Sequence, residues 1–325
     1  MKTSTLIAVA VAVLCAGTAT APFAQSYPDR SVRLVVPFAP GGTTDLIARI
    51  VAAKIDKVLG QPMVIDNRAG GGGIVGANET ARATPDGYNL GVATVSTIAT
   101  APAMFPATTP YNPLTDFTPI INIAATPNVI EVNPSFPAHD FKGFIAELKK
   151  NPGKYSYAST GTGSITHMQM ELFKAQTGTS MVHIPYKGGG PAMTDLLGGQ
   201  VLVNLDNLPS SLPYIKQGKV IPIVIASDKR VADLPDVPTL AEVGLPQVNR
   251  MAFYGIYGPK GLPPEVVKKI HDAVKKVLED PDVRTRIEAT GSVIIGNTPE
   301  EFARQIKTEF ETYKKVVELQ HLKPE

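Results

Sequence analysis

The chain has 325 residues, of which 43% are hydrophobic and 18% are charged, and its formal net charge is +2. This is the composition of a globular protein, and the length allows two domains of roughly 100–200 residues each. The charge is close to neutral and there is no long block of Lys or Arg, so the sequence gives no indication of nucleic-acid binding.

Residues 1–25 have the layout of a secretory signal peptide. Lys2 supplies a positive end, an uncharged run follows from Leu6 to Ala19, and small residues around Ala24 offer a cleavage site. The run is short for a membrane span, which favours a cleaved signal over a retained anchor. The only cysteine, Cys15, lies in this segment. We therefore expect a mature chain without a disulfide, a thiolate nucleophile or a cysteine-bound metal.

Strands and helices alternate in the first part of the mature chain. A strand ends at Pro37, and the run after it has apolar residues at helical spacing until Gly60 stops it. The pattern predicts strands at 31–37, 63–66 and 90–95 and helices at 44–59 and 74–83. Such alternation is typical of an α/β fold with a mostly parallel sheet and helices on its faces.

A second α/β unit follows in the middle of the chain. A strand predicted at 120–124 precedes it. The unit comprises predicted strands at 129–132, 154–158, 181–185, 201–205 and 220–226, and helices at 141–150, 165–176, 191–197 and 208–217. After Asp228 the pattern changes to helices at 266–278 and from Thr298 to about Leu319, with no strand-rich unit. We expect these helices to pack back on the first unit. Domain 1 would then comprise 26–126 and 228–325, domain 2 would comprise 127–227, and the two chain crossings would form a hinge.

The turn Gly41–Asp45 joins the first strand to the first helix. Its glycines allow the backbone to approach a ligand closely, and the free N–H groups at a helix start carry partial positive charge. The hydroxyls of Thr43 and Thr44 add donors, so this turn can hold a carboxylate or phosphate without any Lys or Arg. A purely structural alternative is that Thr44 caps the helix and Asp45 stabilises its first turn.

A second stretch repeats this plan of strand, small-residue loop and helix. It offers hydroxyls and glycines at Ser159, Thr160, Gly161, Gly163 and Ser164. His167, one turn into the helix, either reaches the ligand or packs on the loop, and the structural role is the commoner one for a lone histidine. A protein that binds its ligand in a cleft needs an anion-holding loop on each wall, and the two stretches together predict such a cleft.

Two further places carry polar or flexible residues after strands. Lys187-Gly188 precedes a helix with Pro191 near its start, and Lys187 either adds positive charge to the cleft or lies on the surface. Asp206 follows the strand 201–205, where α/β sheets usually make their ligand contacts.

One glycine pattern is misleading. Gly71, Gly73 and Gly76 fit the G-x-G-x-x-G dinucleotide fingerprint, but no acidic residue follows at the end of a second strand to bind the ribose. We interpret the pattern as a tight turn. The sequence also lacks the G-x-S-x-G, Walker, H-E-x-x-H and S-x-x-K motifs, and its histidines show no metal-ligand spacing. No catalytic group, metal or cofactor is therefore expected.

These segments, taken in order, resemble the periplasmic solute-binding proteins of tripartite tricarboxylate transporters, also called Bug-type receptors. The resemblance covers nearly the whole mature chain. It is carried by the segments 37–45, 66–76, 85–88, 161–167, 185–192, 195–200 and 234–239. The chain departs from the family pattern at residues 253–255, where relatives often carry Trp, and at Arg250, where an acidic residue is common.

The resemblance implies a two-domain, type II periplasmic-binding-protein fold of the Venus-flytrap kind. It implies a monomeric receptor that captures a small organic carboxylate, through backbone amides, hydroxyls and bridging waters, and delivers it to the membrane subunits of a transporter. Asp45 is expected to act through water or an ammonium group, since it would repel a bare carboxylate. The candidate ligand-binding residues are Phe38, Ala39, Gly41, Gly42, Thr43, Thr44, Asp45, Thr97, Ser159, Thr160, Gly161, Gly163, Ser164, His167, Gly188 and Asp206.

Two other functions stay open at this point. A secreted α/β enzyme such as a hydrolase would share the fold class, although the missing nucleophile and metal motifs speak against it. A receptor for another class of transporter would share the cleft. The sequence does not identify the acid, which could be an aliphatic di- or tricarboxylate, an aromatic acid or an acidic amino acid.

Overall fold

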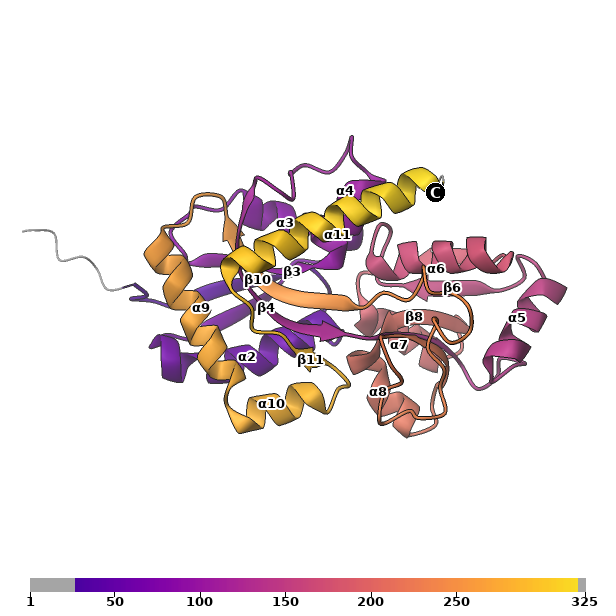
Figure 1. Ribbon diagram of the computed structural model, residues 1–325. Coiled ribbons are helices and arrows are strands. Elements are labelled where there is room, and N and C mark those ends of the chain that lie inside the picture. The colour runs from indigo at the N-terminus through magenta and orange to yellow at the C-terminus, as the bar shows by residue number, and fades with distance from the viewer. Residues whose placement is uncertain (1–26, 321–325) are drawn as a thin grey trace, which may run out of the picture.

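The computed structural model describes residues 27–320, and its strands form two separate sheets (Figure 1). The expected signal peptide and Cys15 lie outside the described residues. The first sheet has the strand order β11-β4-β10-β3-β1-β2, and the second has the order β7-β6-β8-β5-β9. We call the first sheet with its helices the first lobe and the second sheet with its helices the second lobe.

The first lobe begins with three parallel strands. β1 (Val32–Val36) lies between β2 (Met63–Asn67) and β3 (Asn89–Thr94) and pairs in parallel with both. Helix α2 (Thr43–Leu59) buries an apolar stripe that includes Ile47, Ile50 and Ile55, and it ends at Gly60 in the left-handed conformation. Because parallel strands end at the same edge of a sheet, the loops after β1 and β3 lie side by side.

Strand β10 (Ala252–Pro259) corrects the sequence-based prediction for the C-terminal part. It lies between β3 and β4 (Phe117–Thr126) and pairs antiparallel with both, so the sheet is mixed rather than mostly parallel. All of its residues are buried, so they lack the polar–apolar alternation by which a strand is usually detected. The short strand β11 (Val293–Ile294) and helix α10 (Pro281–Glu288) were likewise not predicted.

The C-terminal helices pack on the first sheet, as the sequence indicated. Both α9 (Pro264–Leu278) and α11 (Pro299–Leu319) contact β4. The predicted helix start at Thr298 is confirmed, because its side chain and that of Glu301 form a complete capping box. The remaining helical elements of this lobe are η1 (Gly71–Gly73), α3 (Ile74–Ala81), the π-helix η2 (Ser96–Thr100) and α4 (Ala101–Met104).

The second lobe has a smaller mixed sheet. β6 (Ser156–Ser159) pairs in parallel with β7 (Val182–Pro185) and β8 (Val203–Asn207), while β5 (Asn128–Val132) pairs antiparallel with β8 and β9 (Ile221–Ala226). Four helices belong to it: α5 (Phe141–Lys150), α6 (Ile165–Thr177), α7 (Gly189–Leu197) and α8 (Leu208–Lys216). α6, α7 and α8 each begin within a few residues of the end of a strand, so their N-termini lie at one edge of the sheet.

The segment between β9 and β10 stays with the second lobe before the chain returns to the first (Figure 1). Leu240 N donates to Ile225 O at 2.8 Å, and the amide of Gln169 on α6 donates to Val248 O at 2.6 Å. Among residues 27–320, no helix is both long and apolar enough to cross a membrane.

Candidate ligand-binding site

The loop after β1 touches the start of α7 in the opposite lobe. Ala39 N donates to Lys187 O at 2.9 Å. A β-carbon on Gly42 would lie 3.2 Å from Gly189 N, and one on Gly190 would lie 2.3 Å from Pro40 O. Glycine is therefore needed at Gly190 for the two backbones to approach this closely.

A second contact between the lobes lies on the other side of the same opening. Thr100 Oγ1 donates to Gly163 O at 2.7 Å, and Ile165 N donates to Ser96 Oγ at 3.0 Å. A β-carbon on Gly72 would lie 2.3 Å from Thr162 O. The second glycine loop thus meets η1 and η2 of the first lobe, and the lobes are closed on each other.

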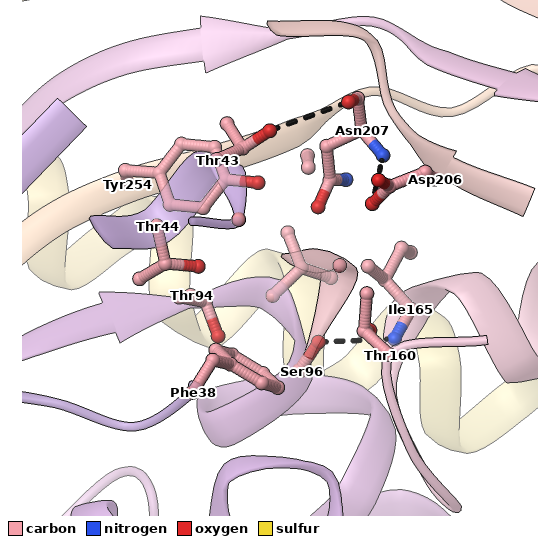
Figure 2. Close-up of a pocket in the computed structure, with 14 residues that line it drawn as sticks. Phe38, Thr43, Thr44, Thr94, Ser96, Thr160, Ile165, Asp206, Asn207 and Tyr254 are labelled. Atoms are coloured by element: carbon pink, nitrogen blue, oxygen red, sulfur yellow. Dashed lines mark hydrogen bonds between the residues drawn. The ribbon is translucent and has the colours of Figure 1, made fainter. Parts of the chain in front are cut away.

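A polar pocket lies between these two contacts (Figure 2). The space open to the centre of a water molecule is only about 10 Å³, which is about the room of one water. No Lys or Arg of residues 27–320 lines it, whereas several hydroxyls do. The lining residues are Phe38, Gly42, Thr43, Thr44, Thr94, Val95, Ser96, Thr160, Ile165, Gly189, Asp206, Asn207, Ala252 and Tyr254.

The N-terminus of α2 forms the donor-rich wall of the pocket. Its N-cap residue is Gly42, which has no side chain to accept from the first N–H groups of the helix. These N–H groups are therefore open to an anion, and the Thr44 hydroxyl lies beside them. The Thr43 hydroxyl also lines the pocket, but it lies 3.3 Å from Asn207 O and 3.0 Å from Ser210 Oγ in the opposite lobe. Tyr254 on β10 points into the pocket beside both threonines (Figure 2), and burial raises its pKa well above the usual value, so it is an uncharged donor.

Asp206 gives the opposite wall a buried carboxyl group. Its Oδ1 accepts from Asn207 N and its Oδ2 from Ser210 Oγ, both at 2.8 Å, and the residue is only 1% exposed. Burial raises the pKa of Asp206 to about 6. Ser210 Oγ also lies 3.0 Å from Thr43 Oγ1, so a hydrogen-bond chain runs from one lobe to the other.

The pocket brings together some of the candidate residues and leaves others outside. It is lined by Phe38, Gly42, Thr43, Thr44, Thr160 and Asp206. The other candidates shape the loops behind these residues without lining the pocket, namely Ala39, Gly41, Asp45, Thr97, Ser159, Gly161, Gly163, Ser164, His167 and Gly188. Lys187 and Arg250 also lie outside the lining.

Asp45 organises the first loop instead of facing the pocket. Its carboxylate accepts from Arg49 Nε at 2.9 Å, from Asn67 Nδ2 at 3.0 Å and from Gly41 N at 3.2 Å. Asn67 also donates to Phe38 O at 2.9 Å. Burial alone would raise the pKa of Asp45, but the hydrogen bonds from Arg49 and Asn67 outweigh it and hold this pKa below its usual range.

His167 supports the second loop from behind. Its Nδ1 accepts from Gly163 N at 3.2 Å, and its ring stacks on His183 with 3.9 Å between centroids. Ser159 Oγ lies 2.7 Å from His183 Nε2. Burial lowers the pKa of His167 to about 4 and that of His183 to about 3, so the stacked pair is neutral at physiological pH.

Sequence reasoning missed several residues of the pocket. Tyr254 and Ala252 were overlooked because they lie on the unpredicted strand β10. Thr94 lies near the end of the predicted strand at 90–95 and Ser96 follows it, so the rule that places ligand contacts at strand ends could have found them. Asn207 and Gly189 adjoin the candidates Asp206 and Gly188 in the sequence.

The two α/β lobes, each presenting strand ends and helix starts to a shared polar pocket, define a two-lobed solute-binding protein. Residues 47–322 match the family model of the tripartite tricarboxylate transporter family receptor, and the chain belongs to this family. Protein BugT of Bordetella pertussis is 34% identical over 97% of both chains.

Solved structures agree with the family and the fold. A structure described as a periplasmic transporter is 51% identical and has a TM-score of 0.91, covering 92% of this chain and all of its own. MatC from Rhodopseudomonas palustris, with bound malate, is 35% identical with a TM-score of 0.86 (90% and 100% covered). An R. palustris protein with adipate is 34% identical with a TM-score of 0.87 (92% and 100% covered). The chain is thus a solute-binding receptor and not an enzyme.

Proposed function

We propose that this receptor binds a small organic carboxylate in the pocket between its lobes and passes it to the membrane subunits of a tripartite tricarboxylate-type transporter. The observation that carries the proposal is the uncapped start of α2, which turns free N–H groups and the hydroxyls of Thr43 and Thr44 toward the pocket. The malate and adipate held by two relatives support the same class of ligand.

We assign the first contacts of the ligand to Gly42, Thr43, Thr44 and Thr160, with Phe38 as an apolar wall and the Tyr254 hydroxyl as a further donor. Asp45 and His167 hold the two loops in shape. The hydrogen bonds that join the lobes on both sides of the pocket support a mechanism in which the ligand enters while the lobes are apart and is enclosed when they close.

We further propose that the hinge consists of the chain crossings at 126–128 and 250–252, so the second crossing lies later in the chain than the position near residue 228 expected from the sequence. The hydrogen bonds from the 239–249 segment to β9 and α6 support this position of the second crossing, with 228–250 moving as part of the second lobe. We also propose that the protein is located in the periplasm, that its signal peptide is cleaved near residue 25 and that it is a monomer.

A thermal-shift screen tests this function. The ligand-stripped receptor is heated with mono-, di- and tricarboxylates, aromatic acids and acidic amino acids, with sugars and metal cations as comparison sets. At least one acid should stabilise the protein saturably, by about 2.7 kcal/mol at 100 times its dissociation constant. Stabilisation by a sugar or a cation, with none from any acid, would contradict the proposal.

A matched pair of variants connects the result to the pocket. Thr43→Val keeps the shape of the side chain but removes its hydroxyl, and it should weaken binding about 10-fold, the size of one hydrogen bond. Thr194→Val makes the same change on the exposed face of α7 and should bind as the wild type does.

A further inference from the structure

The pocket has two chemically different walls. The first lobe presents the uncapped helix start and the hydroxyls of Thr43 and Thr44. The second lobe presents Asp206, whose carboxyl group points into the pocket near Asn207 (Figure 2). A ligand that carries only carboxylates would satisfy the first wall but would be repelled by the second.

Counting donors shows that Asp206 has spare acceptor capacity. A carboxylate accepts about four hydrogen bonds, and only Asn207 N and Ser210 Oγ donate to Asp206 among the described residues. The single proton of Ser210 is also within reach of Asn207 O, at 2.9 Å. Within residues 27–320, no Lys, Arg or His forms an ion pair with Asp206.

The two walls are only one hydroxyl group apart. Ser210 Oγ lies 3.0 Å from Thr43 Oγ1 and 2.8 Å from Asp206 Oδ2. A ligand carboxylate at the start of α2 therefore brings its adjacent carbon close to Asp206. A hydroxyl or ammonium group on that carbon can donate to the Asp206 carboxylate.

From this arrangement we infer that the ligand is a 2-hydroxy or 2-amino carboxylic acid, whose carboxylate meets the start of α2 and whose hydroxyl or ammonium group donates to Asp206. The inference rests on the proposed function and narrows its ligand class. It makes Asp206 the residue that distinguishes substituted acids from unsubstituted acids of the same length.

The other charged or titratable groups near Asp206 do not supply this contact. Glu131 on β5 is a second buried carboxyl group, whose pKa is raised by burial and by the charge of Asp206, and Tyr254 is held uncharged by burial. Neither is among the described residues that donate a hydrogen bond to the Asp206 carboxylate. A donor from the ligand is therefore the favourable partner for the Asp206 carboxylate when the lobes close.

Calorimetric titration with matched acids tests the inference. The panel compares propionate with lactate and alanine, succinate with malate and aspartate, and glutarate with 2-hydroxyglutarate and glutamate, with adipate added as a longer unsubstituted acid. In at least one series, a substituted acid should bind about 10-fold or more tightly than its unsubstituted parent, as expected for one hydrogen bond to a charged group. That acid should also bind more tightly than adipate.

Two variants locate the effect. Asp206→Asn should reduce the preference to within about 3-fold, whereas Glu131→Gln, at the carboxyl group outside the pocket lining, should keep it. Circular dichroism checks the fold of each variant. If Asp206→Asn does not fold, the test rests on the wild type alone. A wild type that does not prefer a substituted acid over its unsubstituted parent would then overturn the inference.

The outcomes separate this inference from the proposed function. Equal or tighter binding of the unsubstituted acids, or a preference that persists in Asp206→Asn, would overturn the inference and leave the carboxylate receptor standing. Failure of every acid in the panel and in the wider thermal screen would overturn both.

Discussion

Gly190 faces Pro40 across the two lobes so closely that a β-carbon on the glycine would lie 2.3 Å from the proline carbonyl oxygen. Gly190 belongs to α7 in the second lobe and Pro40 to the loop after β1 in the first. The contact exists only when the lobes are closed, so a substitution at Gly190 can disturb the closed arrangement selectively.

Gly190→Ala should therefore weaken ligand binding by at least about 10-fold without destabilising the free protein, because it penalises only the closed arrangement. The added methyl group suits the helical position, where alanine is preferred to glycine. Titration calorimetry measures the affinity, and urea unfolding measures the stability of the free protein. Gly198→Ala, at the other end of α7, is the control, since the nearest atoms to its β-carbon all belong to nearby residues of the same lobe. Wild-type affinity in Gly190→Ala would show that this contact is not part of the bound state.

Glu131 and Asn204 lie directly opposite each other on β5 and β8. Glu131 Oε1 accepts from Asn204 Nδ2 at 2.9 Å and from Ser211 Oγ at 2.8 Å, while Glu131 Oε2 and Asn204 Oδ1 are both buried without a partner among the described residues. A proton on Oε2 would remove the negative charge that burial disfavours. Burial, followed by the charge of Asp206, raises the pKa of Glu131 to about 8, in agreement with a protonated side chain.

The raised pKa means that Glu131 contributes its full stability below the ordinary pKa of a glutamate, and that this contribution is lost as the pH rises through about 8. Glu131→Gln supplies a permanent N–H group in place of the titrating proton. The variant should match the wild type near about pH 4.5 and exceed its unfolding free energy by about 1 kcal/mol or more near about pH 9. Denaturant unfolding at both pH values measures this, with the exposed Glu318→Gln as the control. A destabilisation of equal size at both pH values would contradict the protonated pair.

His167 should make the stability of the second loop sensitive to acid. Its neutral Nδ1 accepts from Gly163 N, and its neighbours His183, Glu171 and Lys174 surround the same ring. Because the folded pKa of about 4 is below the value of 6.5 expected for the unfolded chain, the contribution is complete above 6.5 and is lost as the pH falls toward 4.

The unfolding free energy of the wild type should thus fall relative to that of His167→Asn by about 1–2 kcal/mol between about pH 7.5 and pH 5. Asparagine retains an acceptor near the Nδ1 position but does not titrate. His139→Asn, at an exposed histidine, is the matched control and should show no such change. A constant difference between the wild type and His167→Asn across this range would mean that the histidine is not held neutral by burial.

Asp45→Asn tests whether the structure of the first loop depends on the negative charge of the Asp45 carboxylate. The change weakens the ion pair with Arg49 and the hydrogen bonds from Asn67 and Gly41, and it should cost about 1–2 kcal/mol near neutral pH. The pKa of Asp45 is lowered in the folded wild type. The extra stability of the wild type over the variant is therefore present above the usual pKa of an aspartate, and it disappears as the pH falls through the lowered pKa of the folded protein. Urea unfolding near about pH 7 and pH 3 measures the difference, with the exposed Asp236→Asn as the control. Equal stability at neutral pH would indicate that the loop does not need the charge.

Local sequence patterns predicted much of the fold. The apolar spacing of α2 and its glycine stop gave its bounds to within one residue, and the capping box at Thr298 gave the start of α11. Strand β10 escaped prediction because it is buried along its whole length. Its place between β3 and β4 depends on pairing with residues far away in the sequence, which local periodicity does not report.

The site was less predictable than the fold, because its residues were chosen from loops without knowing which atoms face each other. Gly161 and Gly163 were chosen for approach to a ligand, but Gly161 packs on Gly72 and Gly163 on Phe105. Tyr254 could not be chosen without β10. Asp206 was chosen from a rule about strand ends, and its link to Thr43 through Ser210 appears only when the lobes are closed.

Titration calorimetry of the ligand-stripped receptor, followed by small-angle X-ray scattering with and without the best acid, tests whether the two lobes close around a small carboxylate. We predict one saturable site per chain for a small carboxylate and a decrease in the radius of gyration when that site is filled, since the pocket is enclosed only by both lobes together. A best acid that binds without any decrease in the radius of gyration, or no binding by any acid, would contradict it.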